Sequence, residues 1–379
     1  MGKVTLIATA AMGIEALVAR EVRDLGYECE VENGKVTFEA DEKAICRTNL
    51  WLRTADRVKI KVGEFKATTF DELFEKTKAL NWGDYIPENG EFPVIGKSLK
   101  STLFSVSDCQ RIVKKAVVEK LKTTYRRTTW FEEDGPLFRI EIAMLKDIAT
   151  LTIDASGVGL HKRGYRLEQG EAPLKETLAA SLIKLTNWKA DRPFVDPFCG
   201  SGTIPIEAAL IGQNIAPGFN RGFASDEWGW VGKQNWREAR QEAEDLANYN
   251  QPLQIIGSDI DHRMIRVAQD NAEEVGLGDL ISFKQMQVKD FTTKEEYGYV
   301  VTNPPYGERL SERALVEKLY KEMGEVFRPL DTWSMYLLTS YEAFEKCYGK
   351  DASKKRKLFN GFIRTDYYQY FGKRPPRNS

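Results

Sequence analysis

The sequence predicts an α/β protein, with a C-terminal domain built on a mostly parallel sheet and a smaller α+β region before it. From residue 173 onward, helix-like segments alternate with short apolar runs, which is the pattern of a parallel sheet with crossover helices. Before that point, short runs of alternating polarity surround one long amphipathic segment, as expected for antiparallel strands packed on a helix. At 379 residues the chain also exceeds one ordinary core of about 100–200 residues, so several domains are expected.

The first 55 residues are expected to form a small α+β unit. The spacing of apolar residues predicts a strand at 3–8, a helix at 13–25 and two short strands at 28–32 and 35–39. The dipeptide Asn33-Gly34 between the short strands is a hairpin signal, because both residues readily adopt a positive φ.

A second α+β unit is expected from there to residue 155. Its strongest signal is the segment 106–122, where apolar residues recur at helical spacing. Ser107, followed by Gln110 three residues later, predicts a capping box at the start of this helix. Two alternating runs then predict a closing hairpin, at 137–145 and 148–154.

Composition places the chain among folded proteins. Hydrophobic residues make up 42% and charged residues 29%, close to the averages for globular proteins. No run approaches the roughly 18 apolar residues that span a bilayer, and the first residues suit a strand and a helix better than a signal peptide. The five cysteines are dispersed without a CxxC pair, so we expect free thiols in a reducing cytoplasm and no zinc site. Only two histidines are present, which argues against a His-based triad or metal centre.

The net charge of −1 gives no overall attraction to nucleic acid, but one segment is strongly basic. Residues 97–127 contain nine Lys or Arg against two acidic residues. Taken alone, this pattern fits a solvated helix face and an RNA-binding surface equally well. The RNA-binding candidates in this region are Lys97, Lys100, Arg111, Lys114, Lys115, Lys122, Arg126 and Arg127.

The C-terminal domain is expected at 173–379, after a linker at 156–172 that shows no periodicity. Helices are predicted at 174–186, 203–211, 263–275 and 311–327. Strands are predicted at 193–195, 254–258, 281–286, 299–302 and 335–339, with two more at 357–363 and 367–371. The interval 213–252 fits no simple crossover and is interpreted as an insertion. Its aromatic residues are expected to pack it onto this domain: Phe219, Phe223, Trp228, Trp230 and Trp236.

The first strand of this domain runs into the sequence DPFCGSGT, residues 196–203, and a helix follows at once. An acid and two glycines at a strand end let the backbone approach a ligand closely at the switch point of the sheet. A dinucleotide site would need the pattern G-x-G-x-x-G, which is missing here. The acidic Asp196 disfavours an anion and favours a zwitterionic ligand with an amino group. A tight turn without a ligand is the alternative interpretation.

The second strand tip carries Asp259, in the sequence GSDID. A carboxylate at this place can accept two hydrogen bonds from a ribose diol. Asp261 suits a different role, as the N-cap of the helix that starts near Arg263.

The tip of a further strand carries Asn303, Pro304, Pro305 and Tyr306, the most specific motif in the sequence. Two successive prolines can neither continue a strand ladder nor lie inside a helix, so the loop is stiff. An exocyclic base amine is a poor nucleophile, because its lone pair is delocalised into the ring. An Asn oxygen and a proline carbonyl can accept its two N–H bonds and direct the lone pair at a methyl donor, while an aromatic ring stacks on the base. The motif therefore predicts methyl transfer to a base amine without a metal.

The motifs DPFCGSGT, GSDID and NPPYGER, in that order, resemble the class I methyltransferases that act on amino groups of nucleic-acid bases. Over nearly its whole length the chain more closely resembles the bacterial 23S ribosomal RNA guanine-N2 methyltransferases of the RlmL type, through HKRGYR (161–166), PLKETLAA (173–180) and PGFNRGFASDEW (217–228). The resemblance implies a Rossmann-like class I methyltransferase domain with a mostly parallel seven-stranded sheet. It also implies a ferredoxin-like unit at 1–55, a THUMP RNA-binding domain at 56–155, S-adenosylmethionine as cofactor, and ribosomal RNA or tRNA as partner.

The resemblance also assigns roles to the motif residues. It implies cofactor binding by Asp196, Phe198, Cys199, Gly200, Ser201, Gly202, Thr203, Asp259, Ile260 and Asn303, and catalysis by Asn303, Pro304, Pro305 and Tyr306. Relatives usually place an acid after the third strand to meet the adenine amine; here Gln287 stands there, with Asp290 three residues on, and either is a candidate. The linker residues Lys162, Arg163 and Arg166 join the RNA-binding candidates. Some relatives carry a second methyltransferase domain that this sequence lacks, so a single methylation is expected.

The leading hypothesis is an RNA guanine-N2 methyltransferase that acts on 23S ribosomal RNA. A tRNA guanine-N2 methyltransferase and an adenine-N6 nucleic-acid methyltransferase are the alternatives, and NPPY does not separate them. The THUMP-like half favours structured RNA. A nucleotide-dependent oxidoreductase is opposed by the missing glycine pattern, a non-enzymatic RNA-binding factor by the intact NPPY loop, and tRNA thiolation by the lack of an ATP-binding P-loop. No sequence feature decides the oligomeric state, and a monomer is the working expectation.

Overall fold

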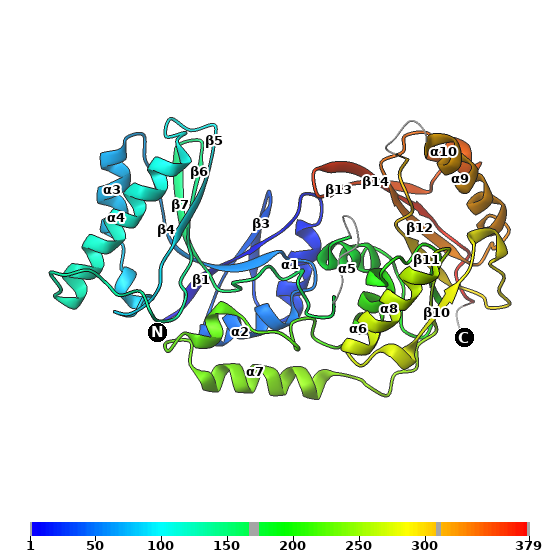
Figure 1. The fold of residues 1–379 in the computed structure, drawn as a ribbon, viewed down its shortest axis with the longest axis horizontal. Helices are drawn as coiled ribbons and strands as arrows, with labels where there is room; N and C mark the ends of the chain where they lie inside the picture. The colour runs from blue at the N-terminus through cyan, green and yellow to red at the C-terminus, as the bar shows by residue number, and fades with distance from the viewer. Residues whose placement is uncertain (1, 167–173, 308–311, 377–379) are drawn as a thin grey trace. The chain divides into compact units, whose positions relative to one another are not determined.

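The computed structural model describes residues 2–166, 174–307 and 312–376, which fold into two compact units (Figure 1). The first unit comprises residues 1–10, 18–160 and 221–242, and the second comprises 11–17, 161–220 and 243–379. The chain therefore returns to the first unit twice, at residue 18 and at residue 221, before it completes the second. Three predictions fall outside the described residues: the linker residues 167–172, the motif residues 308–310 and the helix start at Ser311.

One continuous seven-stranded sheet supports the first unit, in the order β2-β3-β1-β4-β7-β6-β5. The long strand β4 (Arg57–Lys66) joins its two halves, because it pairs with β1 on one side and with β7 on the other. The two α+β units expected from the sequence thus share one sheet. The remaining strands are β1 (Val4–Thr9), β2 (Cys29–Glu32), β3 (Lys35–Ala40), β5 (Val94–Leu99), β6 (Ile140–Leu145) and β7 (Ile148–Asp154).

The helices of the first unit include the long helix that the apolar spacing predicts, α4 (Val106–Tyr125). Its buried stripe is Cys109, Val113, Ala116, Val117 and Leu121. The predicted capping box at Ser107 is wrong. The helix starts earlier, with Ser105 as N-cap, and Ser107 lies within the first turn. The other helices are α1 (Glu15–Asp24), whose first residues belong to the second unit, α2 (Glu42–Trp51) and α3 (Phe70–Lys78), which packs on α4.

The aromatic residues of the predicted insertion pack differently from the expectation. Residues 221–242 belong to the first unit, where the Trp228 ring stacks on Phe138 with centroids 4.8 Å apart. The Trp228 Nε1–H donates to the carbonyl of Leu137 at 3.0 Å. Trp230 in turn lies edge-on to Tyr85 at 5.7 Å. The expectation that these rings pack the insertion onto the C-terminal domain is therefore wrong for this stretch, because they complete the core of the first unit.

The second unit contains the predicted seven-stranded sheet, in the order β10-β9-β8-β11-β12-β14-β13. The first five strands in this order, from β10 to β12, run parallel to one another. β14 pairs antiparallel with β12, and β13 pairs antiparallel with β14 at the edge of the sheet. The predicted α/β fold with a mostly parallel sheet is confirmed. The strands are β8 (Phe194–Asp196), β9 (Ile255–Asp259), β10 (Ile281–Gln285), β11 (Tyr299–Thr302), β12 (Ser334–Thr339), β13 (Lys354–Asn360) and β14 (Ile363–Tyr370).

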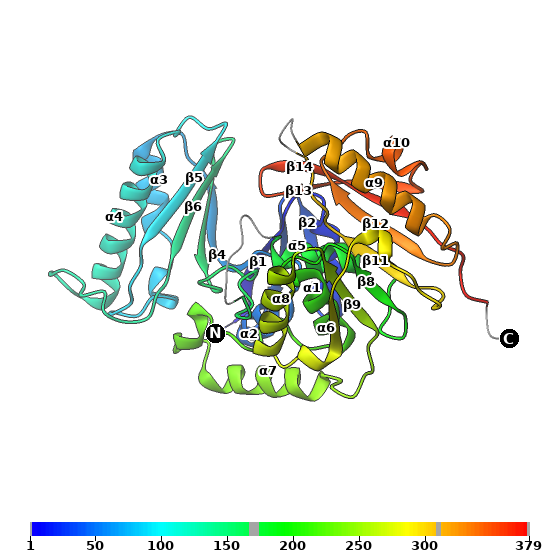
Figure 2. The same cartoon turned by 45° about the vertical axis from the view of Figure 1, so that its right-hand side comes forward.

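Helices cover both faces of this sheet, and each face has its own apolar core (Figure 2). One core contains side chains of α5 (Glu176–Lys184), α6 (Thr203–Gly212) and α8 (His262–Glu274). The other contains side chains of α9 (Arg313–Phe327) and α10 (Phe344–Tyr348). A further helix, α7 (Lys233–Leu246), lies mostly in the first unit. A sheet buried on both faces exposes its ligand-binding edge at the carboxyl ends of the strands.

Three further properties of the described residues bear on function. No helix among them is long and apolar enough to cross a membrane. The same residues contain no cluster of His, Cys, Asp and Glu able to hold a metal ion. All five cysteines are free thiols, and Cys46, Cys109 and Cys199 are buried.

Candidate active site

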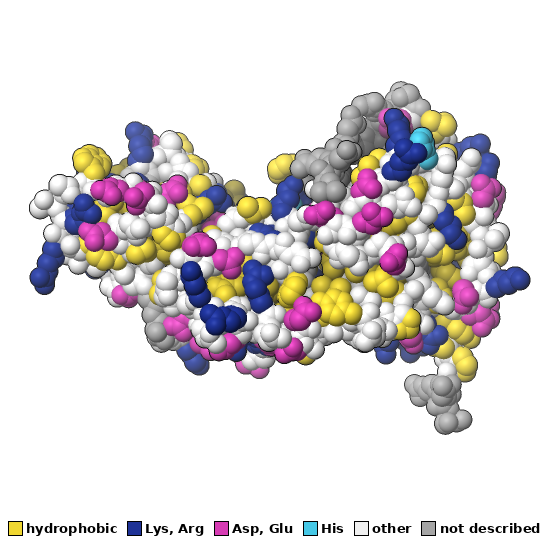
Figure 3. Space-filling view, turned by 60° about the horizontal axis from the view of Figure 1, so that its bottom comes forward, with side chains coloured by type: hydrophobic (Ala, Val, Ile, Leu, Met, Phe, Trp, Pro, Cys, Tyr) yellow, Lys and Arg dark blue, Asp and Glu magenta, His cyan; other side chains and the backbone are white. Residues whose placement is uncertain are grey.

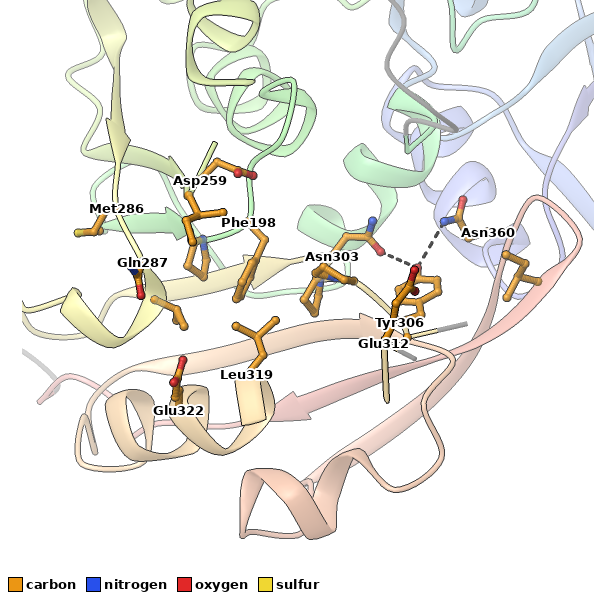
Figure 4. A pocket seen from close by; sticks show the side chains of 17 residues that line it. Phe198, Asp259, Met286, Gln287, Asn303, Tyr306, Glu312, Leu319, Glu322 and Asn360 are labelled. Atoms are coloured by element: carbon orange, nitrogen blue, oxygen red, sulfur yellow. Dashed lines mark hydrogen bonds between the residues drawn. The ribbon is translucent and has the colours of Figure 1, made fainter. Parts of the chain in front are cut away.

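A cavity of about 750 Å³ opens at the carboxyl ends of β8, β9 and β11, the three neighbouring strands that carry the sequence motifs. This size is typical of a cofactor or substrate site, roughly 300–1,000 Å³. Figure 4 shows Met286, Gln287 and Glu322 toward one end and Asn303, Tyr306 and Asn360 toward the other, with Phe198 between them. The lining residues are Pro197, Phe198, Asp259, Ile260, Met286, Gln287, Val288, Asn303, Pro304, Pro305, Tyr306, Gly307, Glu312, Leu319, Glu322, Asn360 and Ile363.

Asp196 ends β8 and ties the first motif loop to the third. Its Oδ1 accepts hydrogen bonds from the Phe198 N–H at 3.1 Å and from the Thr302 hydroxyl at 2.6 Å. The side chain is 1% exposed and does not line the cavity, so the structure shows Asp196 holding the two loops together, and its contact with the cofactor stays a prediction. Burial, with a smaller contribution from the charge of Asp259, raises the pKa of Asp196 to about 7.

The two glycines of the first motif hold conformations that side chains resist. Gly200 has φ +50° and Gly202 has φ +83°. A Cβ at Gly202 would also come within 2.9 Å of the Ala268 Cβ on α8. Gly202 is the N-cap of α6, so this close packing brings the start of that helix next to the strand tips. Cys199, Gly200, Ser201, Gly202 and Thr203 themselves do not line the cavity.

Asp259 ends β9 and faces the cavity with Ile260. Its Oδ2 accepts from the Gly200 N–H at 3.1 Å, and its Oδ1 accepts from the Asp261 N–H at 2.9 Å. Each carboxylate oxygen keeps capacity for another donor. The predicted N-cap is confirmed, because Asp261 accepts from the Arg263 N–H at 2.9 Å.

Residues beyond β10 and on α9 complete the same end of the cavity. Of the two candidates for the adenine contact, Gln287 lines the cavity and Asp290 does not. Sequence reasoning missed Met286, Leu319 and Glu322. The pair on α9 could have been found from their three-residue spacing, which places both on one helix face.

The NPPY loop holds its amide oxygen in a hydrogen-bonded chain at the other end. The Tyr306 hydroxyl donates to Asn303 Oδ1 at 2.5 Å and accepts from Asn360 Nδ2 at 3.3 Å (Figure 4). Behind the loop, the Tyr320 hydroxyl of α9 donates to the Pro305 carbonyl at 2.8 Å. The loop is therefore fixed both by its prolines and by side chains from α9 and β13.

Sequence reasoning missed Asn360 because it put the final turn in the wrong place. The strands predicted at 357–363 and 367–371 are in fact β13, ending at Asn360, and β14, starting at Ile363. The dipeptide Asn360-Gly361 is a hairpin signal that marks the actual turn.

Residues 161–166, with the sequence HKRGYR, hold the first motif loop and helix α6 in place and expose little positive charge to RNA. Arg163 is 3% exposed, and its Nε lies 3.3 Å from Oε1 of the buried Glu207 on α6. The Tyr165 hydroxyl donates to the same oxygen at 3.1 Å. Arg166 donates to the Thr203 hydroxyl at 3.0 Å and pairs with Glu176 at 3.2 Å. The expected RNA contacts of Arg163 and Arg166 are therefore wrong, because their charges are used inside the domain, whereas Lys162 is exposed.

More than half of the cations in the basic segment of the first unit form ion pairs, three of them with acids outside the segment and two with the acids inside it. Five of its nine cations form ion pairs: Lys97 with Glu141, Arg111 with Asp108, Lys114 with Glu133, Lys122 with Glu119 and Arg127 with Glu88. On the face drawn in Figure 3, basic and acidic side chains are likewise interspersed. Lys100, Lys115 and Arg126 remain exposed.

Lys114 is the clearest correction among these candidates. Its ammonium lies 2.7 Å from Glu133, donates to the Phe92 carbonyl at 3.0 Å and sits 3.5 Å from the centre of the Phe92 ring. A lysine held on three sides stabilises its own unit, so Lys114 is unsuited to bind phosphate.

The cavity residues fit S-adenosylmethionine. The carboxylate of Asp259 suits a ribose diol, and the Gln287 amide with Met286 and Leu319 suits an adenine ring. Fold and site together define an S-adenosylmethionine-dependent methyltransferase of class I.

Comparison with protein families agrees and is more specific. The model "RMKL-like, methyltransferase domain" matches residues 163–369, more than half of the chain, and the chain belongs to this family. The model "RlmL ferredoxin-like domain" matches residues 5–59, and the THUMP domain matches residues 67–154.

Relatives match over the full length. The "Putative RNA methyltransferase YpsC" of Bacillus subtilis (strain 168) is 70% identical over 379 residues, which is 100% of this chain and 98% of that protein. A crystal structure from Listeria monocytogenes, named "predicted N6-adenine-specific DNA methylase", is 65% identical with a TM-score of 0.95, covering 98% of this chain and 97% of that one. SMU.472, solved as a complex with SAH, is 51% identical with a TM-score of 0.95, covering 99% and 100%. The names agree on methyl transfer and differ on the nucleic acid.

Proposed function

We propose that this protein transfers a methyl group from S-adenosylmethionine to the exocyclic N2 of a guanine in structured RNA, with 23S ribosomal RNA as the substrate. One observation carries the chemical part of the proposal. Asn303 presents an amide oxygen to the cavity, fixed by the Tyr306 hydroxyl at 2.5 Å, with no titratable acid or base beside it in the four-residue motif other than that phenol.

Asn303 would act by accepting one N–H of the base amine. Its Oδ1 uses one lone pair for Tyr306 and keeps the other for the base. The Pro305 carbonyl accepts from Tyr320 with one lone pair and keeps the other, so either proline carbonyl of the motif can serve as the second acceptor. Two acceptors in fixed positions turn the amine so that its lone pair points along the line of methyl transfer.

The cofactor, when bound, supplies an electrophilic methyl group on a sulfonium. The residues around it bind and orient: Asp259 would hold the ribose, Gln287 the adenine, and Phe198 the wall between cofactor and base. Tyr306 lines the amine end and offers its ring to a base inserted there. Methyl transfer at this site thus relies on alignment rather than on proton abstraction.

The choice of RNA is supported by the THUMP domain and by the name of the 70%-identical relative. The choice of guanine-N2 in 23S ribosomal RNA is supported by the resemblance to RlmL-type enzymes and by the matching ferredoxin-like domain. The cytoplasm is the compartment in which such a reaction would occur.

Mass spectrometry of nucleosides is the test. Ribosomal RNA and tRNA from a strain lacking the gene should differ from wild type by the loss of N2-methylguanosine in 23S ribosomal RNA alone, and the purified protein with S-adenosylmethionine should restore it. Loss of N6-methyladenosine, or loss confined to tRNA, would replace the proposal with the corresponding alternative.

A further inference from the structure

The tip of the β13–β14 hairpin forms part of the cavity wall at its amine end. Asn360 and Ile363 face each other across the hairpin, and both line the cavity. Since β12 and β13 both pair antiparallel with β14, β13 runs parallel to β12, and its carboxyl end reaches the edge of the sheet where the motifs lie. Only Gly361, at φ +62°, and Phe362 form the turn between the strands.

Phe362 is the most exposed large apolar side chain on the described part of the chain, at 105% of its reference exposure. A single exposed apolar residue is common on protein surfaces and carries no argument by itself. The position of Phe362 distinguishes it from other exposed apolar residues. It lies in a short turn between Asn360 and Ile363, which pair across the hairpin and line the cavity.

The same hairpin is basic. Residues 354–366 contain five Lys or Arg and one acid. Some of this charge is used locally, because Lys355 pairs with Glu345 at 2.6 Å and Arg356 donates to the Gly13 carbonyl at 3.2 Å. Lys357 and Arg364 are exposed, and across the described ranges neither has an acidic side chain within ion-pair distance.

We propose that this hairpin tip is a nucleic-acid contact of the catalytic domain, in which Phe362 stacks on the nucleotide next to the target base and Lys357 and Arg364 meet the phosphates beside it. The proposal rests on the proposed function, since it assumes that a base enters the cavity. A base that enters must leave its stack, and its neighbour then exposes an unstacked face. An aromatic ring at the cavity rim can cover that face, and stacking tolerates any base.

The test is binding and methylation of ribosomal RNA from the deletion strain by the full-length protein. Phe362→Ala should weaken RNA binding roughly 5- to 150-fold, the range that loss of one base–aromatic stack produces. Phe362→Trp should restore near-native binding, because indole keeps the stacking surface. Leu246→Ala, at a 52%-exposed leucine of α7, is the matched control and should change nothing. Affinity for SAH should stay the same in all four proteins.

The predicted phosphate contacts of Lys357 and Arg364 are tested by the salt dependence of RNA binding. Lys357→Gln combined with Arg364→Gln should lower the dependence of log Kd on log salt by roughly 0.7–0.9 for each phosphate that the variant no longer neutralises. If the native protein methylates RNA and both Phe362→Ala and the double variant bind it as the native protein does, the hairpin proposal is wrong while the proposed function stands. If Phe362→Ala instead changes only the oligomeric state in sedimentation, the tip is a protein contact, and the proposal is equally overturned. A native protein that methylates no RNA would refute the proposed function itself.

Discussion

The Tyr306 hydroxyl donates a 2.5 Å hydrogen bond to Asn303 Oδ1, so the two non-proline residues of the NPPY loop hold each other in place. Asn360 extends the chain by donating to the same hydroxyl at 3.3 Å. The amide oxygen that the mechanism needs is thereby oriented before a base arrives. Orientation of this kind reduces the cost of aligning the reacting atoms.

Tyr306→Phe should separate the hydroxyl from the ring. The variant keeps a stacking surface and loses the bond to Asn303, so single-turnover methylation should slow roughly 2- to 12-fold, as expected for one neutral hydrogen bond of about 0.5–1.5 kcal/mol. Cofactor affinity should be unchanged. Tyr341→Phe removes a comparable hydroxyl, bonded to Glu317 outside the cavity lining, and should be near-native. A native rate in Tyr306→Phe would mean that the hydroxyl does not orient Asn303.

Asn303→Ala should lower turnover by at least roughly 100-fold with little change in cofactor affinity. The reason is that the amine loses its acceptor and its alignment to the methyl group, and misplacement near reacting atoms has an effect of this order. Asn303→Asp keeps an acceptor in nearly the same place and should retain partial activity. Near-full turnover of Asn303→Ala on its RNA, measured under single-turnover conditions, would contradict the mechanism.

The second unit was predictable from sequence because its signals are local. Parallel strands buried on both faces are short apolar runs, and each motif follows such a run directly, as Asp259 follows β9. The position of Asn303 at the tip of β11 needed no more than the proline pair.

The failures involve interactions between segments far apart in the chain. Lys114 pairs with Glu133, and the buried Arg163 pairs with Glu207. Because both acids lie far along the chain from their partners, the residues next to Lys114 and Arg163 in the sequence could not show that neither is available to bind RNA. Trp228 stacks on Phe138, which precedes it by 90 residues, and no periodicity reports that. Pairing across distance is decided by topology, which a local pattern does not contain.

Asp259→Ala should weaken S-adenosylmethionine binding roughly 30- to 150-fold, equivalent to about 2–3 kcal/mol, because a carboxylate accepting from the ribose is lost. The variant also removes the acceptor of the Gly200 N–H, so part of the loss would come from the glycine loop. Asp259→Asn keeps one oxygen acceptor, so its affinity for S-adenosylmethionine should lie between those of the native protein and Asp259→Ala. Titration calorimetry gives both affinities, and an unchanged value for Asp259→Ala would remove Asp259 from the ribose site.

Asp196 predicts how stability depends on pH. Its pKa is raised to about 7 in the folded protein from an ordinary value near 3.8, so the folded state holds a proton over that interval more tightly than the unfolded state. Stability from this group is therefore fully present below pH 3.8 and is lost as pH rises toward 7, by at most about 4 kcal/mol. Asp196→Asn keeps an Oδ1 acceptor for Thr302 and Phe198, and its urea midpoint should fall less than that of the native protein between pH 5 and pH 8.

Asp261 provides a control for that experiment, because its pKa is shifted in the opposite direction. Asp261, the half-buried N-cap of α8, has a pKa lowered by its hydrogen bonds from Arg263, so its stabilising effect is present at neutral pH and is lost on acidification. Asp261→Asn should therefore leave the change between pH 5 and pH 8 as it is in the native protein. Parallel curves for Asp196→Asn and the native protein would show that Asp196 does not titrate in this range.

The cations of the first unit should divide into RNA-binding and structural ones. Lys115 and Arg126 are exposed and have no ion pair among the described residues, whereas Lys114 is held by Glu133 and Phe92. Lys115→Gln with Arg126→Gln should weaken RNA binding and reduce the salt dependence of log Kd by roughly 0.7–0.9 for each phosphate left without its cation, because fewer counterions are released. Thermal stability should be unchanged. Lys114→Gln should do the reverse, lowering the melting temperature while the salt dependence of RNA binding stays native. RNA affinity that depends on Lys114 and not on Lys115 or Arg126 would show that the ion pair with Glu133 opens on RNA binding, and this division would be wrong.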